Sequence, residues 1–208
     1  MEFQPLKYIY KSAGSPTAPT LLLLHGTGGN EHDLVPLASN FGTGYNILSV
    51  RGNVTENGMP RFFKRLGMGV FDEQDLHFRT DELVAFVKQA AHTEGFDAAQ
   101  IIALGYSNGA NIAGATLIQH PDFLAGAILY RPMQPFKITL SGGTKKTVPV
   151  FFSSGKLDPT VSPSSTIAYL ETLKNLGFTV NYNELQTGHN LTREDITLSA
   201  EWLKENFS

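Results

Sequence analysis

The sequence predicts an α/β protein in which a mostly parallel central sheet carries helices on both faces. Short apolar runs rich in Leu, Ile and Val alternate with longer stretches of helical period, which is the pattern of successive β-α units. Most of these runs are continuously apolar, as expected for strands that helices cover on both sides. The expected strands span residues 20–24, 46–50, 101–104, 126–130, 148–152 and 179–184, and residues 3–10 are a candidate antiparallel edge.

Amphipathic helices are expected around these strands, because apolar residues recur there at intervals of three and four. Capping residues mark where three of the helices begin: Asn30, Ser162 before Pro163, and Thr192 with Asp195 three residues later. Neither an internal repeat nor a linker interrupts the chain, so residues 1–208 are expected to form a single α/β domain. The apolar positions are Leu34, Leu37, Ala38 and Phe41; Leu83, Phe86, Val87 and Ala90; Ile167, Leu170, Leu173 and Leu176; and Ile196, Ala200, Leu203 and Phe207.

The composition excludes several classes of partner and site. Apolar residues make up 41% of the 208 residues and the net charge is -3, so neither nucleic acid nor an anionic lipid surface is an expected partner. The chain has no cysteine, which excludes disulfides, a thiolate nucleophile and cysteine-ligated metals. It shows no signal-peptide core and no run of about 18 apolar residues that could span a membrane. The cytoplasm is therefore the expected location.

The segment Gly105-Tyr106-Ser107-Asn108-Gly109 matches the pattern G-x-S-x-G and lies between an apolar strand and an alanine-rich helical stretch. Such a strand–turn–helix context exposes a serine hydroxyl on a sharp and strained turn. The helix that follows presents unpaired N–H groups to any oxyanion formed above it. Ser107 is therefore the candidate nucleophile, and an ordinary glycine-rich turn is the alternative.

Asp158 and His189 follow Ser107 in the chain order nucleophile, acid, histidine. Asp158 comes soon after the apolar strand VPVFF, and His189 comes between a predicted strand and the last helix. The other histidines all precede Asp158, so only His189 fits the third place. Asp122 and Asp195 are rival acids, but Asp122 precedes its strand and Asp195 is better explained as a helix cap. We therefore expect a Ser107–His189–Asp158 triad.

The segment LLLLHGTGGNEHDL, in which an early strand leads into a His-Gly loop, is the expected source of the second oxyanion donor. The predicted oxyanion hole consists of the backbone N–H groups of Thr27 and Asn108. Gly26, Gly28 and Gly29 would let the loop lie close to the substrate, although three glycines are also typical of a flexible turn. Acyl chemistry of this kind requires neither a metal nor an organic cofactor.

The chain resembles the phospholipase/carboxylesterase family of α/β-hydrolases nearly from end to end. The segments that carry the resemblance are LLLLHGTGGNEHDLVPLA, RGNVTENGMPRFFKRLGMGVFDEQDL, IIALGYSNGANIA, VFFSSGKLDPTVSP and LQTGHNLTREDI. The second of them is similar to bacterial members linked to quinone and hydroquinone stress. The resemblance implies a cytosolic carboxylesterase of the α/β-hydrolase fold that acts on small or modest acyl esters, with its triad at Ser107, Asp158 and His189.

A minimal or absent lid is expected, because only 17 residues, Arg131 to Thr147, separate two strands where larger relatives insert lid helices. An open and shallow site favours small or soluble esters. Tyr106 and Asn108 beside the serine depart from the thioesterase members, which makes long-chain thioesters less expected as substrates. Four residues are candidates for lining the pocket, and core packing explains each of them equally well: Phe62, Phe63, Phe71 and Met133.

Other classes of function stay open at this point. The same triad serves thioesterases, lysophospholipases, peptidases and acyltransferases, because it determines the acyl chemistry and leaves the acceptor free. A hydrolase-like binding protein without activity is the non-enzymatic alternative. Nucleotide binding is disfavoured, because the chain contains neither G-x-G-x-x-G nor G-x-x-x-x-G-K-[ST]. A homodimer is compatible with the sequence.

Overall fold

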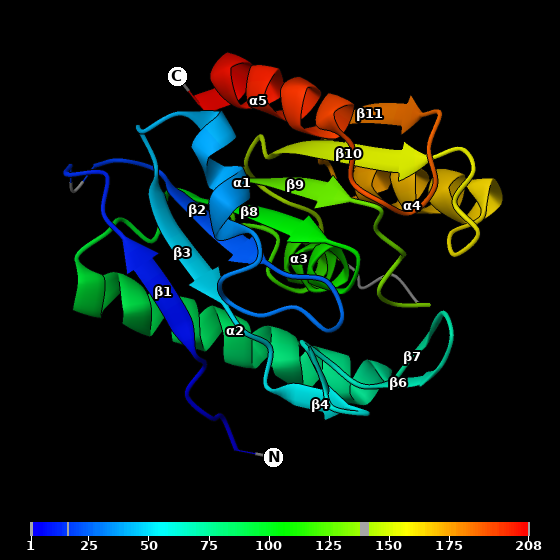
Figure 1. Cartoon of the computed structure of the whole chain (residues 1–208), viewed down its shortest axis with the longest axis horizontal. Helices are drawn as coiled ribbons and strands as arrows, with labels where there is room; N and C mark the ends of the chain where they lie inside the picture. Colours follow the sequence, from blue (N-terminus) through cyan, green and yellow to red (C-terminus); the bar gives the residue numbers. More distant parts are fainter. Residues whose placement is uncertain (1, 16, 138–141, 208) are drawn as a thin grey trace.

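A seven-stranded sheet forms the centre of the computed structural model, which describes residues 2–15, 17–137 and 142–207 (Figure 1). The strands lie in the order β1-β3-β2-β8-β9-β10-β11. β1 pairs with β3 in antiparallel orientation, and every other neighbouring pair is parallel, which confirms the predicted fold class. The strands are β1 (Tyr8–Lys11), β2 (Thr20–Leu24), β3 (Asn46–Val50), β8 (Ile101–Tyr106), β9 (Gly126–Tyr130), β10 (Pro149–Gly155) and β11 (Thr179–Leu185).

The direction of strand addition reverses between β2 and β8. From β2 the chain adds β3 on one side, then returns to add β8 on the other side and continues outward through β9, β10 and β11. The loops that follow β2 and β8 therefore leave neighbouring strand ends and diverge. In open parallel sheets this switch point at the carboxyl edge is where ligands bind.

Helices cover both faces of the sheet. Leu22 and Leu24 of β2 belong to one apolar cluster and Leu21 and Leu23 to another, because successive side chains of a strand point to opposite faces. All four side chains are buried, which explains why this strand reads as a continuous apolar run. α2 (Glu73–Glu94), α3 (Asn108–Gln119) and α4 (Pro163–Asn175) contribute to the first cluster, and α1 (Val35–Ala38), the 3-10 helix η1 (Ser39–Phe41) and α5 (Arg193–Phe207) to the second (Figure 1).

Two of the predicted helix caps form as expected. The Ser162 hydroxyl accepts a hydrogen bond from the Ser165 N–H, with a proline in the first turn of α4. Before α5, the Thr192 hydroxyl accepts from the Asp195 N–H at 3.3 Å while the Asp195 carboxylate accepts from the Thr192 N–H at 2.8 Å. This reciprocal pair satisfies two N–H groups that the start of a helix leaves without intrahelical partners.

The predicted Asn30-capped helix is wrong. The Asn30 carboxamide accepts a hydrogen bond from the His32 N–H at 2.9 Å and closes a local turn. Helix α1 begins only at Val35, with Leu34 at its N-cap, and it passes into η1 after one turn. The side chain of Asn30 thus competes for backbone donors that a helix would use, as is typical of asparagine in turns.

The predicted apolar face of α4 is wrong at Ile167, which is 56% exposed. Tyr169 is fully buried in its place and packs edge-on against Phe152 of the sheet. Gly114 in α3 makes room for it, since a methyl group there would lie 2.0 Å from the Tyr169 hydroxyl. The missing side chain on α3 therefore decides which face of α4 turns inward.

The irregular region of residues 53–74 contains two small antiparallel hairpins that were not among the predicted elements. One consists of β4 (Val54–Glu56) and β5 (Met59–Arg61), joined by Asn57 and Gly58 with φ of 49° and 79°. The other consists of β6 (Arg65–Gly67) and β7 (Val70–Phe71). In the connection from β9 to β10, the described residues 131–137 and 142–148 form no helix or strand, and residues 138–141 lie outside the described part.

None of the helices in the described part of the chain is long and apolar enough to span a membrane.

Candidate active site

Ser107 occupies the turn between β8 and α3 at the switch point of the sheet. Its φ of 52° and ψ of -110° are unfavourable for a residue with a side chain. The Ser107 N–H donates to the Tyr130 carbonyl at 2.9 Å, and its own carbonyl accepts from the Asn111 N–H at 2.9 Å. The neighbouring strand and the first turn of the helix therefore hold the strained conformation in place.

The two glycines of the G-x-S-x-G pattern are required by close packing. A methyl group on Gly105 would lie 2.4 Å from the Gly109 carbonyl oxygen, and one on Gly109 would lie 1.9 Å from the Leu24 carbonyl oxygen. Because backbone atoms cannot move aside as a flexible side chain can, neither position accepts a larger residue without a shift of α3. The glycines thus let the helix approach β2 and β8 closely.

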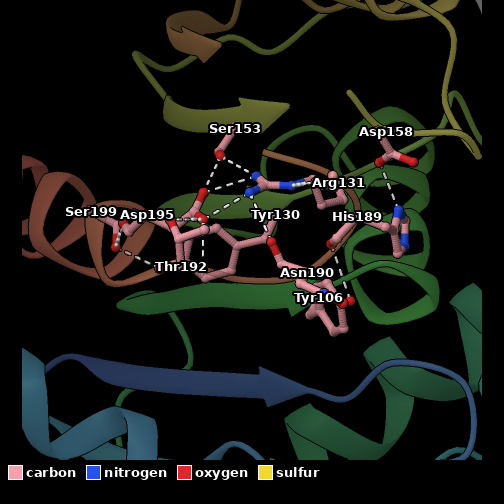
Figure 2. A network of polar contacts seen from close by, with 11 residues as sticks. Tyr106, Tyr130, Arg131, Ser153, Asp158, His189, Asn190, Thr192, Asp195 and Ser199 are labelled. Atoms are coloured by element: carbon pink, nitrogen blue, oxygen red, sulfur yellow. Dashed lines mark hydrogen bonds and ion pairs between the residues drawn. The ribbon is translucent and has the colours of Figure 1, made fainter. Parts of the chain in front are cut away.

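The structure brings Ser107, His189 and Asp158 together from three different loops. His189 Nε2 lies 2.9 Å from Ser107 Oγ, and His189 Nδ1 lies 2.7 Å from Asp158 Oδ2 (Figure 2 shows the second contact). Because an ionised carboxylate only accepts hydrogen bonds, Nδ1 carries the proton and Nε2 is left to accept from the serine hydroxyl. This is the arrangement that a general base needs beside a nucleophile.

Asp158 is aimed at His189 by the backbone of its own loop. Its Oδ1 accepts from the N–H groups of Thr160 at 2.7 Å and Val161 at 3.3 Å, which leaves Oδ2 for the imidazole. The carboxylate is almost fully buried, whereas the His189 side chain is 24% exposed and open to a substrate. Gly155 permits this approach, since a methyl group there would lie 2.2 Å from the Gly188 carbonyl oxygen.

The loop after β2 lies against the hairpin formed by β4 and β5. The Gly28 N–H donates to the Pro60 carbonyl at 2.9 Å, and the Arg61 guanidinium donates to the Thr27 hydroxyl at 2.8 Å. Within the described ranges, neither the Thr27 N–H nor the Asn108 N–H donates to another residue. Both predicted oxyanion donors are thus without a protein acceptor, and their role as an oxyanion hole stays a prediction.

His25 orients the first peptide of that loop. Its Nε2 accepts from the Gly52 N–H at 3.1 Å, so the proton of the neutral ring is on Nδ1, which donates to the Gly26 carbonyl at 2.6 Å. In a trans peptide the carbonyl and the next N–H point in opposite directions, so this bond turns the Thr27 N–H away from His25. Burial, the largest cause, lowers the pKa of His25 and keeps the ring neutral.

The four candidate pocket residues separate into two pairs. Phe62 and Phe63 are buried members of the apolar core, so core packing and not pocket lining accounts for them. Phe71 is half-buried and lines a pocket of 230 Å³ together with Gln134 and Phe136. Met133 is not among the residues that line this pocket, but its methyl group faces Gly69, which does line it.

The two rival acids have other partners. Asp122 accepts hydrogen bonds from the Thr144 hydroxyl and the Lys145 N–H. Asp195 caps α5 as expected, but it also forms a fully buried ion pair with Arg131 at 2.8 Å. Arg131 was not among the predicted site residues, since no local sequence pattern marks an arginine whose partner lies 64 residues away.

Comparisons with known proteins agree with this fold. Residues 8–206 match the family model described as phospholipase/carboxylesterase. MhqD of Bacillus subtilis (strain 168), a protein named as a hydrolase, is 44% identical over 200 residues, which cover 96% of this chain and 98% of that protein.

Two solved structures are similar over nearly their full length. The crystal structure of the Bacillus cereus carboxylesterase has a TM-score of 0.94 and 42% identity, with 97% of this chain and 95% of that chain covered. The carboxylesterase from Mesorhizobium loti has a TM-score of 0.89 and 28% identity, with 96% and 94% covered.

Proposed function

Because the chain belongs to the phospholipase/carboxylesterase family of hydrolases, we propose that it is a serine carboxylesterase that cleaves small or modest acyl esters through Ser107, His189 and Asp158. The observation that carries the proposal is the pair of contacts at His189, 2.9 Å to Ser107 Oγ and 2.7 Å to Asp158 Oδ2. A hydroxyl, an imidazole and a carboxylate in this order are the parts of a proton-transfer chain for acyl transfer.

In the acylation step, Ser107 Oγ attacks the ester carbonyl while His189 Nε2 takes the hydroxyl proton. Asp158 keeps the imidazole in the correct tautomer and stabilises the imidazolium that forms. The imidazolium then protonates the alcohol oxygen and the carbon–oxygen bond breaks. The alcohol departs, and the acyl group stays bonded to Ser107.

In the deacylation step, His189 takes a proton from a water molecule that attacks the acyl-enzyme. The carboxylic acid leaves and Ser107 recovers its proton, so one water is consumed and no oxidant or reductant is needed. In both steps the Thr27 and Asn108 N–H groups would bind the negative oxygen of the tetrahedral intermediate. Each such donor is worth on the order of 100- to 1000-fold in rate.

Two features support small or modest esters as substrates. The described residues of the β9–β10 connection contain no lid helix. A pocket of 230 Å³ beside Phe71, whose lining includes neither Ser107 nor His189, is the proposed site for the acyl or alkyl group. Pockets for larger drug-sized ligands usually exceed about 300 Å³. A short acyl or alkyl group would fit such a pocket, whereas a long chain would extend into solvent.

A chain-length series of aryl esters, measured with the wild type and Ser107→Ala, tests the proposal. We expect the wild type to favour short acyl chains and Ser107→Ala to lose about five to six orders of magnitude in kcat, as for the serine of subtilisin. Esterase activity that survives in Ser107→Ala would contradict the role of Ser107. Faster cleavage of amides or thioesters than of matched esters would contradict the substrate class.

A further inference from the structure

The loop that carries His189 lies between β11 and α5 and is held by side chains on both sides of the histidine. The Gly188 carbonyl accepts from Arg131 Nε at 3.2 Å, and the Asn190 carbonyl accepts from Arg131 Nη2 at 3.1 Å. The His189 carbonyl accepts from the Tyr106 hydroxyl at 3.2 Å (Figure 2). Over the described residues, none of these three carbonyls accepts from a backbone N–H.

Arg131 uses all of its side-chain donors in this network. Besides the two loop carbonyls, Nη1 donates to Ser153 Oγ at 2.5 Å and to Asp195 Oδ1 at 2.8 Å, and Nη2 donates to Asp195 Oδ2 at 2.8 Å. These contacts account for each of the five N–H groups of a guanidinium. A lysine ammonium has three donors on one atom and could not reach the same acceptors.

Asp195 ties the guanidinium to the start of α5. Its carboxylate accepts a hydrogen bond from Ser153 Oγ. It also accepts from the Thr192 N–H and from the Thr192 hydroxyl, both at 2.8 Å. Burial alone would raise the pKa of Asp195, but the hydrogen bonds from Arg131, Ser153 and Thr192 outweigh it and lower the pKa. The carboxylate therefore stays ionised and anchors Arg131 (Figure 2).

The backbone of Arg131 is fixed between the nucleophile turn and β10. Its φ of 54° is unfavourable for a residue with a side chain, and its N–H donates to the Ser153 carbonyl at 2.8 Å. The preceding residue, Tyr130, accepts from the Ser107 N–H. Tyr130, whose carbonyl binds the Ser107 N–H, and Arg131, whose guanidinium binds the His189 loop, are thus neighbours in the chain.

Stability alone is a weak explanation for such a pair. The desolvation of two buried charges offsets much of their mutual attraction, and proteins in which both partners are replaced by apolar residues are often equally stable. Two of the five donors of Arg131, moreover, serve the loop carbonyls and not Asp195. We propose that Arg131, backed by Asp195, and Tyr106 are positioning residues that hold the backbone around His189, so that its imidazole stays aligned with Ser107 and Asp158. This inference rests on the proposed function.

The first test is Arg131→Lys in the full chain, with circular dichroism to show that the variant is folded. We expect kcat for a short aryl ester to fall about 10- to 100-fold, because misplacing a catalytic group by about 1 Å has an effect of this size. KM should change by less than about threefold, since the substrate contacts remain. A folded Arg131→Lys with wild-type kcat would overturn the proposal.

A second variant, Arg131→Met with Asp195→Asn, removes both charges and keeps a carboxamide oxygen that can accept from the Thr192 N–H at the start of α5. Removing both partners of a buried ion pair is often neutral for stability, whereas removing one partner leaves an uncompensated buried charge. We expect a melting temperature close to that of the wild type together with a kcat lowered at least about tenfold. A stable double variant with full activity would show that the pair serves the fold alone.

The matched control is Ser199→Ala. Ser199 is buried in the same network and its hydroxyl contacts Tyr130 at 2.5 Å, but it makes no hydrogen bond to residues 188–190. We expect this variant to lose stability and keep kcat. If it loses kcat as Arg131→Lys does, general loosening of the network explains the effect and the proposal fails.

A readout without turnover separates this inference from the proposed function. The proton shared by His189 Nδ1 and Asp158 should give a far-downfield NMR signal in the wild type, and this signal should be lost in Arg131→Lys. If the wild type shows the signal but hydrolyses no ester, the proposed function fails and the positioning still holds. If both wild type and Arg131→Lys show it equally, the positioning fails.

If neither Arg131 variant folds, Tyr106→Phe tests the proposal. It keeps the ring that packs against Gly26 and His189 and removes only the hydroxyl on the His189 carbonyl. We expect a severalfold lower rate of inactivation by a fluorophosphonate, because the serine and imidazole meet less often in the reactive geometry. An unchanged rate would contradict the proposal.

Discussion

A methyl group on Gly109 would lie 1.9 Å from the carbonyl oxygen of Leu24, so the first turn of α3 rests directly on the end of β2. Leu24 is followed by the His25-Gly26-Thr27 segment, and Gly109 lies two residues after Ser107. This close approach, together with the packing of Gly26 against Tyr106, brings the nucleophile turn and the proposed oxyanion loop together.

Gly109→Ala should destabilise the protein by about 3 kcal/mol or more, because the new methyl group meets backbone atoms that cannot repack. Urea unfolding measures the change. The control is Gly44→Ala, a position with nothing within 4 Å of the added group, where the free energy of unfolding should stay within about 1 kcal/mol. Equal stability of the two variants would contradict the proposed close packing.

Asp158→Asn should lower kcat by about 10⁴-fold with little change in KM, as the equivalent change does in chymotrypsin-like proteases. An amide can donate to His189 Nδ1, which would move the ring proton to Nε2 and leave no acceptor for the serine hydroxyl. Steady-state kinetics measure the effect. A loss smaller than about tenfold would mean that another group orients His189.

His25 should contribute to a pH dependence of stability. The causes that lower its pKa below 6.5 are burial, the largest, and Arg51, whereas the Gly26 carbonyl, Asp33 and Glu31 oppose them. The unfolded chain therefore binds a proton at this residue at a higher pH than the native state does. The contribution of neutral His25 to the free energy of unfolding is therefore complete above the unfolded pKa of 6.5. It is lost as the pH falls through the lowered native pKa.

Urea unfolding between pH 5 and 8, the range where histidines usually titrate, compares the wild type with His25→Asn. The free energy of unfolding of the wild type should fall more steeply toward acid, and the variant should also lose esterase activity because the Gly26–Thr27 peptide is released. Identical pH slopes would show that His25 is not held neutral.

Phe71→Ala should change the acyl-chain preference. The Phe71 ring lines the 230 Å³ pocket and stacks edge-on against Phe63, so its removal lengthens the space available to a substrate. We expect the ratio of kcat/KM for longer over shorter aryl esters to rise about tenfold, the value of one to two methylene groups in an apolar pocket. Phe123→Ala is the control, since this half-buried ring follows the opposite end of α3 from Ser107. An unchanged ratio in Phe71→Ala would place the acyl group elsewhere.

The strands were predictable because burial on both faces leaves a simple signal. The runs at residues 20–24, 46–50 and 126–130 coincide with β2, β3 and β9, since strands covered by helices on both sides are apolar over most of their length. The β4–β5 hairpin also had a local signal, the dipeptide Asn57-Gly58, which is the strongest short-range mark of a tight hairpin turn. This hairpin was not among the predicted elements.

The candidate triad residues could be named from the sequence because each follows a strand whose carboxyl end lies at one edge of the sheet. Arg131 also directly follows a strand, β9, but this position alone does not identify the Arg131–Asp195 ion pair. Asp195 reads as a helix cap, and it is one, but nothing near Arg131 in the sequence indicates that both would be buried together. Contacts between loops that are far apart in the sequence depend on how the layers of the fold pack, and local sequence patterns do not encode this packing.

Peptide mapping by mass spectrometry after reaction with a fluorophosphonate tests the proposal that Ser107 is the activated nucleophile most directly. We predict one adduct per chain, located on Ser107, with esterase activity lost in proportion to labelling and with no adduct in Ser107→Ala or in heat-unfolded protein. An adduct on another residue, or a fully active protein after prolonged exposure, would contradict the account.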